Sequence, residues 1–138
     1  MYKRLFLALF TVFSFQLLFA QQKEVTNFPK GSTPKEVGKR LAYHFVNNKH
    51  ELYDRYVHYA EVCTWNGALD YALAFKNQKL IKLLQDKFEP LFTYEKALLP
   101  PMNHVDYNMF GSLALKLYQI TKDERYKKIG LDYADSQW

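Results

Sequence analysis

Two copies of one helical-hairpin pattern constrain the fold of this chain more than any other feature of its sequence. Residues 76–79 and 122–125, which begin 46 positions apart, are short polar turns where an apolar segment ends and a Lys-rich amphipathic segment begins. A repeat of about 20–50 residues is typical of stacked supersecondary units. No segment alternates apolar and polar residues strongly enough to predict a strand. The sequence therefore predicts an all-α chain built from repeated helical hairpins.

Five helices are predicted from apolar spacing and from capping residues. Thr33, Pro34 and Glu36 form a helix start with a cap, a first-turn proline and a capping-box glutamate. Asn77 and Asp123 are expected to cap two later helices. The predicted ranges are 34–47, 59–75, 78–92, 107–120 and 124–137. The two more apolar helices, 59–75 and 107–120, are expected to be inner helices and the other three outer helices.

Other segments are predicted to depart from regular helix. Residues 21–33 are expected to form an extended lead-in, and the tyrosine-rich residues 50–58 a loop or irregular turn. Residues 65–67 are expected to interrupt helix 59–75 near its N-terminal end. Pro90 should end or kink helix 78–92, because proline cannot donate the helical hydrogen bond.

The first 20 residues have the pattern of a secretory signal peptide. Lys3 and Arg4 precede a charge-free apolar run of 16 residues that ends at Ala20. This run is shorter than the about 20 residues of a spanning helix. Cleavage before Gln21 is therefore predicted, with an uncleaved anchor as the alternative. The mature protein is expected to be secreted or periplasmic, without stable insertion in the membrane.

Composition argues against two broad classes of protein. A hydrophobic fraction of 49% disfavours intrinsic disorder. The formal charge of +5 includes the leader, and the remaining lysines alternate with acidic residues, so nucleic-acid binding is not expected. The 11 Tyr and 11 Phe suit a protein that packs large helices or stacks on flat ligands such as sugar rings. The lone Cys63 is expected to be a small buried hydrophobe.

A polar motif at 104–111 lies just after the helix-breaking pair Pro100 and Pro101. Asp106 is placed where a loop enters the first turn of a helix, and a carboxylate is favoured there by free N–H groups and the helix dipole. Asp106 could therefore be a simple N-cap. The crowding of His104, Asp106, Tyr107 and Asn108 before an apolar run instead favours the mouth of a pocket.

Four motifs together resemble the unsaturated rhamnogalacturonyl hydrolases, glycoside hydrolase family 105, and the related unsaturated glucuronyl hydrolases of family 88. The motifs are WNGA at 65–68, LLPP at 98–101, HVDYNMFG at 104–111 and YADSQW at 133–138. The resemblance implies an (α/α)6 barrel of six helical hairpins. Residues 34–138 would supply fewer than three of the six hairpins, so the barrel would be incomplete.

The resemblance also implies an unusual glycosidase chemistry. The substrates carry a 4,5-unsaturated uronic acid at the non-reducing end, as left by polysaccharide lyases. An Asp protonates C4, water adds at C5, and the hemiketal opens and releases the neighbouring sugar. The chemistry is general acid–base catalysis and needs no metal and no cofactor.

Site residues are implied by position in the motifs. Asp106 matches the first active-site Asp of the family and would hold a sugar hydroxyl or position the catalytic water. Trp65 would present a stacking surface to the pocket. His104 and Asn108 would contact the substrate at the same rim, although His104 could equally be a solvated loop histidine. The principal acid/base Asp is expected beyond residue 138.

The sequence stops at Trp138, at the end of a predicted outer helix and without a polar capping repeat. The chain is therefore expected to be the N-terminal fragment of a longer exported enzyme and to be inactive by itself. Its expected partner is an unsaturated uronic-acid oligosaccharide. Two alternatives stay open: another six-hairpin enzyme of acidic sugars, and a non-catalytic helical-repeat binding protein whose aromatic residues only pack.

Overall fold

The computed structural model describes residues 26–137. The predicted signal peptide, its cleavage before Gln21 and the side chain of Trp138 lie outside the described residues. The chain divides into two units, 1–31 and 32–138, and all the described helices and strands belong to the second. Residues 26–33 form neither helix nor strand.

The second unit is mostly helical, which confirms the prediction of an all-α chain. Its α-helices are α2 (Pro34–Asn47), α3 (Tyr59–Ala74), α4 (Gln78–Phe88), α5 (Val105–Thr121) and α6 (Glu124–Asp135). Two 3-10 turns follow α4, namely η1 (Glu89–Phe92) and η2 (Lys96–Leu98). Among the described residues, no helix has the length and hydropathy needed to cross a bilayer.

The helix starts follow the predicted capping chemistry. The Thr33 hydroxyl accepts from the Glu36 N–H at 3.2 Å, and the Glu36 carboxylate accepts from the Thr33 N–H at 3.2 Å. Asn77 Oδ1 accepts from the Leu80 N–H at 3.1 Å and Asp123 Oδ1 from the Arg125 N–H at 2.9 Å. These bonds satisfy N–H groups that have no partner inside the helix.

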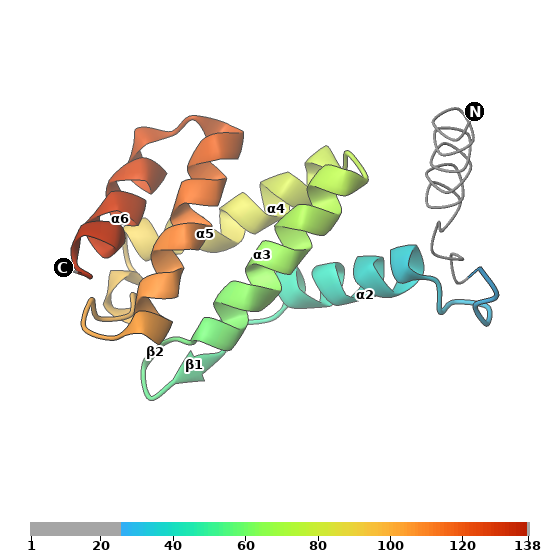
Figure 1. Ribbon diagram of the computed structural model, residues 1–138, viewed down its shortest axis with the longest axis horizontal. Helices are drawn as coiled ribbons and strands as arrows, with labels where there is room; N and C mark the ends of the chain where they lie inside the picture. The colour runs from blue at the N-terminus through green and yellow to red at the C-terminus, as the bar shows by residue number, and fades with distance from the viewer. Residues whose placement is uncertain (1–25, 138) are drawn as a thin grey trace, which may run out of the picture. The chain divides into compact units, whose positions relative to one another are not determined.

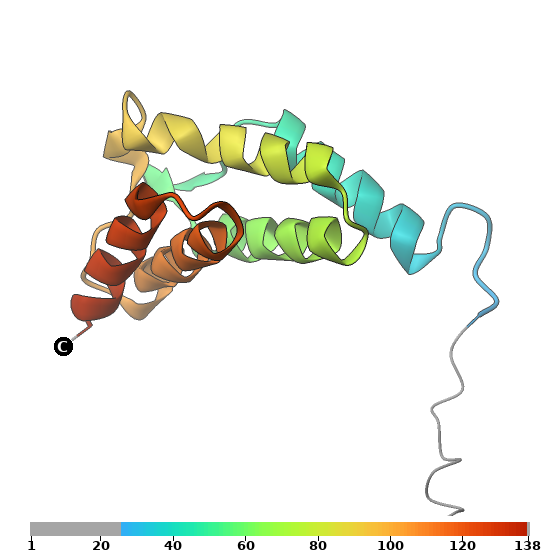
Figure 2. The same cartoon turned by 90° about the horizontal axis from the view of Figure 1, so that it is seen from above.

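The more apolar helices lie next to each other. α3 packs against α2, α4 and α5, and α5 packs against α6. The two views show α5 beside α3, with α4 in a second layer that runs along α3 (Figures 1 and 2). Lys116 of α5 joins the two helices through Asp70 at 2.6 Å and the Asn66 carbonyl at 3.2 Å. The hairpin α3–α4 is thus followed by the hairpin α5–α6, in the order that the sequence repeat predicts.

Aromatic side chains connect the two hairpins in the core. The Phe88 ring of α4 lies 5.6 Å from Trp65, 5.3 Å from Phe110 and 5.0 Å from Tyr126, measured between ring centroids. All four side chains are fully buried. This cluster therefore buries large aromatic surface between the two hairpins.

Two glycines let α5 and α6 cross closely. A Cβ on Gly130 would lie 2.5 Å from Leu115 Cγ, and a Cβ on Gly111 would lie 2.6 Å from the Tyr133 Cβ. Both distances are far below van der Waals contact between carbon atoms. The close crossing therefore depends on the missing side chains at these two positions.

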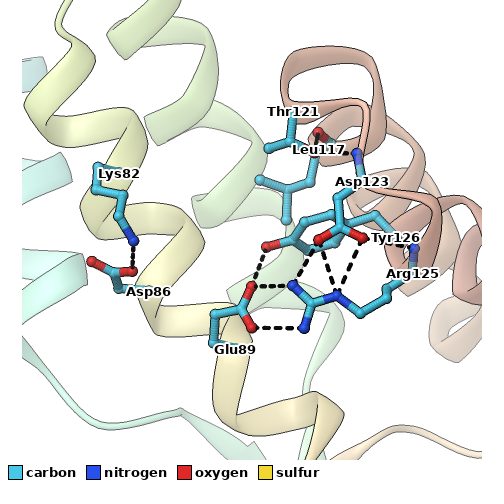
Figure 3. Close-up of polar contacts among 8 residues, drawn as sticks. All are labelled: Lys82, Asp86, Glu89, Leu117, Thr121, Asp123, Arg125 and Tyr126. Carbon is cyan, nitrogen blue, oxygen red and sulfur yellow. Dashed lines mark hydrogen bonds and ion pairs between the residues drawn. The ribbon is translucent and has the colours of Figure 1, made fainter.

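A polar network fastens α6 to the end of α4 (Figure 3). The Arg125 guanidinium donates to both carboxylate oxygens of Glu89 at 3.0 Å, and to the Asp123 carboxylate as well. The Tyr126 hydroxyl donates to Glu89 at 3.3 Å. Desolvation by burial raises the pKa of Tyr126, and the hydrogen bonds from Arg125 hold the pKa of Asp123 below its usual value.

Three local predictions need correction. Residues 50–58 contain a short antiparallel pair, β1 (Leu52–Tyr53) and β2 (Tyr56–Val57), which is too brief to produce a visible alternation in the sequence. Residues 65–67 do not interrupt α3, which runs unbroken from Tyr59 to Ala74. Cys63 is exposed, because the buried side of α3 carries Val62, Trp65 and Leu69.

The expected helix end at Pro90 is confirmed. The α-helix α4 stops at Phe88, and the chain continues as the 3-10 turn η1.

Candidate functional site

His104 and Asp106 meet at the start of α5. His104 is the N-cap residue, and its Nδ1 accepts from the Asp106 main-chain N–H at 3.2 Å. Asp106 lies in the first turn, as predicted, but its own carboxylate does not cap the helix. Asp106 Oδ2 lies 3.6 Å from His104 Nδ1. The Asp106 side chain is 55% exposed, so its carboxylate remains accessible to a ligand.

A hollow of about 340 Å³ opens beside the Asp106 carboxylate. Its lining comes from two helix starts and from the short strand pair. The lining residues are Tyr53, His58, Tyr59, Asn103, His104, Asp106 and Tyr107. His58 and Tyr59 begin α3, and His104 to Tyr107 begin α5, so the hollow lies where both predicted inner helices start.

The rings around the hollow contact one another in pairs. His58 lies 4.4 Å from Tyr59 and 5.2 Å from Tyr53, and His104 lies 6.0 Å from Tyr107, between ring centroids. Tyr53 and Tyr59 are nevertheless 58% and 42% exposed as residues. Exposed tyrosine rings offer an apolar face together with a hydroxyl, which suits a ligand that is flat and also polar.

A hydrogen bond from α6 anchors the Pro100–Pro101 loop that precedes the site. The Tyr133 hydroxyl of α6 donates to the Pro100 carbonyl, which anchors the double-proline turn that leads into Asn103 and His104. Burial raises the pKa of Tyr133, so this hydroxyl keeps its proton and remains a donor. The position of the α5 start therefore depends on its partner helix α6.

Asn108 lies on a different side of α5 from the hollow. Its residue is 6% exposed, and its Oδ1 has no hydrogen-bond partner among the residues that the structure describes. Asn108 lines a neighbouring depression of about 230 Å³, which shares Asn103 and His104 with the hollow. The structure thus brings His104 and Asp106 together, and places Asn108 behind them rather than beside the same ligand space.

Trp65 does not form the stacking surface expected from the sequence. Its side chain is fully buried, and its indole N–H donates to the Leu84 carbonyl at 3.2 Å. Phe45 and Phe88 contact the ring edge to face at 5.5 Å and 5.6 Å. The Trp65 side chain points from α3 toward α4, so it contributes to the core instead of the pocket.

Four lining residues were not identified from the sequence: Tyr53, His58, Tyr59 and Asn103. The tyrosine-rich composition of residues 50–58 was the available signal, because a run of polar and aromatic residues before an inner helix resembles the pattern that precedes α5. Across residues 26–137, no three His, Cys, Asp or Glu side chains gather in an arrangement that could hold a metal ion.

Comparisons of the chain with known protein families, with curated proteins and with solved structures found no match.

Proposed function

We propose that this chain forms part of an exported glycoside hydrolase that hydrates a 4,5-unsaturated uronic acid at the non-reducing end of an oligosaccharide. The observation that carries the proposal is the placement of the half-exposed Asp106 carboxylate in a hollow walled by tyrosine rings. A sugar ring can lie on a tyrosine face while its hydroxyls bond to the surrounding polar groups.

Asp106 would act on the sugar as a hydrogen-bond acceptor. An ionised carboxylate accepts strong hydrogen bonds from a hydroxyl or from a water molecule. In the proposed reaction Asp106 holds a hydroxyl of the unsaturated sugar or positions the water that adds at C5. A second carboxyl group, expected outside residues 1–138, protonates C4. General acid–base catalysis of this kind contributes about 10²–10⁴-fold to a rate.

The proposed scaffold is an (α/α)6 barrel. Two complete hairpins, α3–α4 and α5–α6, follow α2, and the helices that carry the hollow, α3 and α5, lie side by side. Further hairpins would continue this order around the barrel and close the open flank of α5. In this proposal the chain alone holds one wall of the active site, so it binds the sugar without turning it over.

A binding protein without catalytic activity is the second candidate. The buried Trp65 favours it, because that aromatic residue packs the core instead of meeting a ligand. The exposed residues Tyr53 and Tyr59 beside the half-exposed Asp106 carboxylate favour the enzyme. An enzyme acting on a different acidic sugar would share the same hollow and differ in the contacts that select the substrate.

Export belongs to the same proposal. Residues 1–20 have the charge and hydropathy of a signal peptide, and a secreted or periplasmic location suits an enzyme that receives lyase products of polysaccharides. Mass spectrometry of the mature protein should find its N-terminus at Gln21 or within a few residues. Soluble protein that keeps Met1 would contradict export.

The function is tested by Asp106→Asn in the complete protein that carries this chain. Loss of the absorbance of the conjugated double bond measures turnover of an unsaturated rhamnogalacturonan disaccharide. The variant should fold normally and turn over the disaccharide about 10²-fold more slowly, the size of effect expected when a group that positions substrate or water is lost. Asp86→Asn removes the same charge from an exposed site on α4 and should leave turnover unchanged. Wild-type turnover by Asp106→Asn would remove this residue from the active site.

A further inference from the structure

A buried carboxylate lies directly behind the strand pair that walls the hollow. Glu61 belongs to the first turn of α3, and its side chain is 1% exposed. Oε1 lies 2.5 Å from His50 Nδ1, and Oε2 accepts from the Glu51 main-chain N–H. Both oxygens of one carboxylate are therefore bound to the segment that leads into β1.

A lysine from another helix completes the same cluster. Lys87 Nζ of α4 lies 3.5 Å from Glu61 Oε1 and donates to the Asn48 carbonyl at 2.9 Å. Its side chain is only 6% exposed. His50 also places Nε2 3.5 Å from the Glu95 carboxylate. The cluster thus connects α3, α4 and Glu95, which follows η1, to residues 48–51, the segment that precedes β1.

Aromatic rings shield these charges from water. Lys87 Nζ lies 4.7 Å from the Phe45 ring centroid and 5.7 Å from that of Trp65, and the His50 ring stacks on Trp65 at 5.7 Å. Desolvation of buried ions offsets much of their attraction, so a pair of this kind is weak support for overall stability. Its geometry is nonetheless strict, because moving one partner leaves the others buried and unpaired. Such a cluster suits a positioning role.

The strand pair needs an anchor of this kind. Each strand has two residues, and an isolated pair is not stable in water without further packing. Of its four residues, Val57 alone is buried, while Leu52 and Tyr53 are exposed. The hydrogen bond from the Glu51 N–H to the Glu61 carboxylate attaches the open end of the pair to α3, and the bond from the His58 N–H to the Glu51 carbonyl at 3.3 Å closes the pair at that same end.

We propose that Glu61 is a positioning residue, which fixes the strand pair so that Tyr53 and His58 form the wall of the hollow opposite Asp106. Glu61 does not line the hollow and would not touch the sugar. It acts through the Glu51 main chain and His50. The effect on the sugar rests on the proposed function, whereas the effect on the strand pair does not.

The experiment compares Glu61→Gln with Glu124→Gln in the full chain. Glu124 is an exposed carboxylate that pairs with Lys127 at 3.1 Å on the surface of α6, so it controls for the loss of one charge. Limited trypsin digestion reports on the strand pair, because the Arg55–Tyr56 bond lies in its turn. Mass spectrometry gives the cleavage rate at each bond, and calorimetry gives the affinity for the unsaturated rhamnogalacturonan disaccharide.

Glu61→Gln should raise the cleavage rate at Arg55–Tyr56 at least about tenfold, since local opening governs proteolysis, with little change at Arg125 in α6. Its affinity for the disaccharide should fall by a similar factor, while Glu124→Gln matches wild type in both measurements. Equal acceleration at every bond would show a general stabilising role and overturn the proposal. Faster cleavage at Arg55 with unchanged affinity would overturn the link to the sugar.

Two further outcomes need their own controls: a Glu61→Gln variant that does not fold, and a wild-type chain that does not bind the disaccharide. If Glu61→Gln fails to fold, His50→Ala removes one contact and keeps the Glu61–Lys87 pair, and it should still accelerate cleavage at Arg55. Wild-type cleavage by His50→Ala would then overturn the proposal. If wild type does not bind the disaccharide, the proposed function fails, and the cleavage rates alone decide whether Glu61 fixes the strand pair.

Discussion

His104 caps α5 by accepting the main-chain N–H of Asp106 through its Nδ1 at 3.2 Å, so the cap and the carboxylate are two different residues. This separation matters for function, because a carboxylate that capped its own helix would be committed to main-chain groups. The Asp106 side chain instead stays half-exposed beside the tyrosine rings of the hollow.

Loss of the His104 cap should lower the stability of the protein. His104→Ala removes the side-chain acceptor and should lower the free energy of unfolding by about 0.5–2 kcal/mol, as for other N-caps. His104→Asn keeps an acceptor at the same position and should remain close to wild type. Urea denaturation measures both variants. Equal stability of His104→Ala and wild type would show that the hydrogen bond from Asp106 contributes nothing.

The close crossing of α5 and α6 makes a second prediction. Gly130→Ala places a Cβ 2.5 Å from Leu115 Cγ, and the helices must move apart or Leu115 must change rotamer. Overpacking of this kind should cost about 1–3 kcal/mol of unfolding free energy.

Gly67→Ala is the matched control for that substitution. Apart from its chain neighbours and the adjacent backbone of α3, no heavy atom lies within 4 Å of a Cβ at Gly67, in the middle of α3. The added methyl group should therefore stabilise the helix by about 0.5–1 kcal/mol, because alanine loses less backbone freedom on folding. Thermal unfolding compares the two variants, and a stabilising Gly130→Ala would contradict the close crossing.

The Asp123 carboxylate should make stability depend on pH. Hydrogen bonds from Arg125 lower the pKa of Asp123 in the folded protein below its value in the unfolded chain. A lowered folded pKa adds stability that is present above the unfolded pKa, about 3.9, and is lost as pH falls through the folded pKa.

Asp123→Asn isolates this charge, because Asn is an equally good N-cap. Wild type should be the more stable protein at neutral pH. The difference in unfolding free energy should stay constant above about pH 5 and shrink as pH falls below about 4. Urea titrations at several pH values measure the difference. A difference that is independent of pH would show that the Arg125 contacts do not lower the pKa of Asp123.

Local signals in the sequence predicted the helices well. Caps at Thr33, Asn77 and Asp123 act within three residues, so their effect is visible in the sequence itself. The end of α4 before Pro90 follows from the missing N–H of proline. These effects need no knowledge of the packing partner.

The sequence could not predict which residues meet in the hollow or which side of α3 is buried, because both depend on packing between helices. Tyr59 joins Asp106 in the hollow although 47 positions separate them, and only the contact between α3 and α5 brings them together. α3 is apolar around much of its circumference, so its sequence did not show that Trp65 faces inward and Cys63 faces solvent. The side on which an aromatic residue lies depends on the neighbouring helix, as with α4 beside Trp65.

We propose that the hollow at the starts of α3 and α5 binds an unsaturated uronide. The direct measurement is a nuclear magnetic resonance titration of the isotope-labelled chain with the unsaturated rhamnogalacturonan disaccharide. Amide shifts should concentrate at residues 53–59 and 103–107, and Asp106→Asn should weaken the binding. Shifts that gather instead around the separate depression between Phe92 and Ile129, or no shifts at all, would contradict the account.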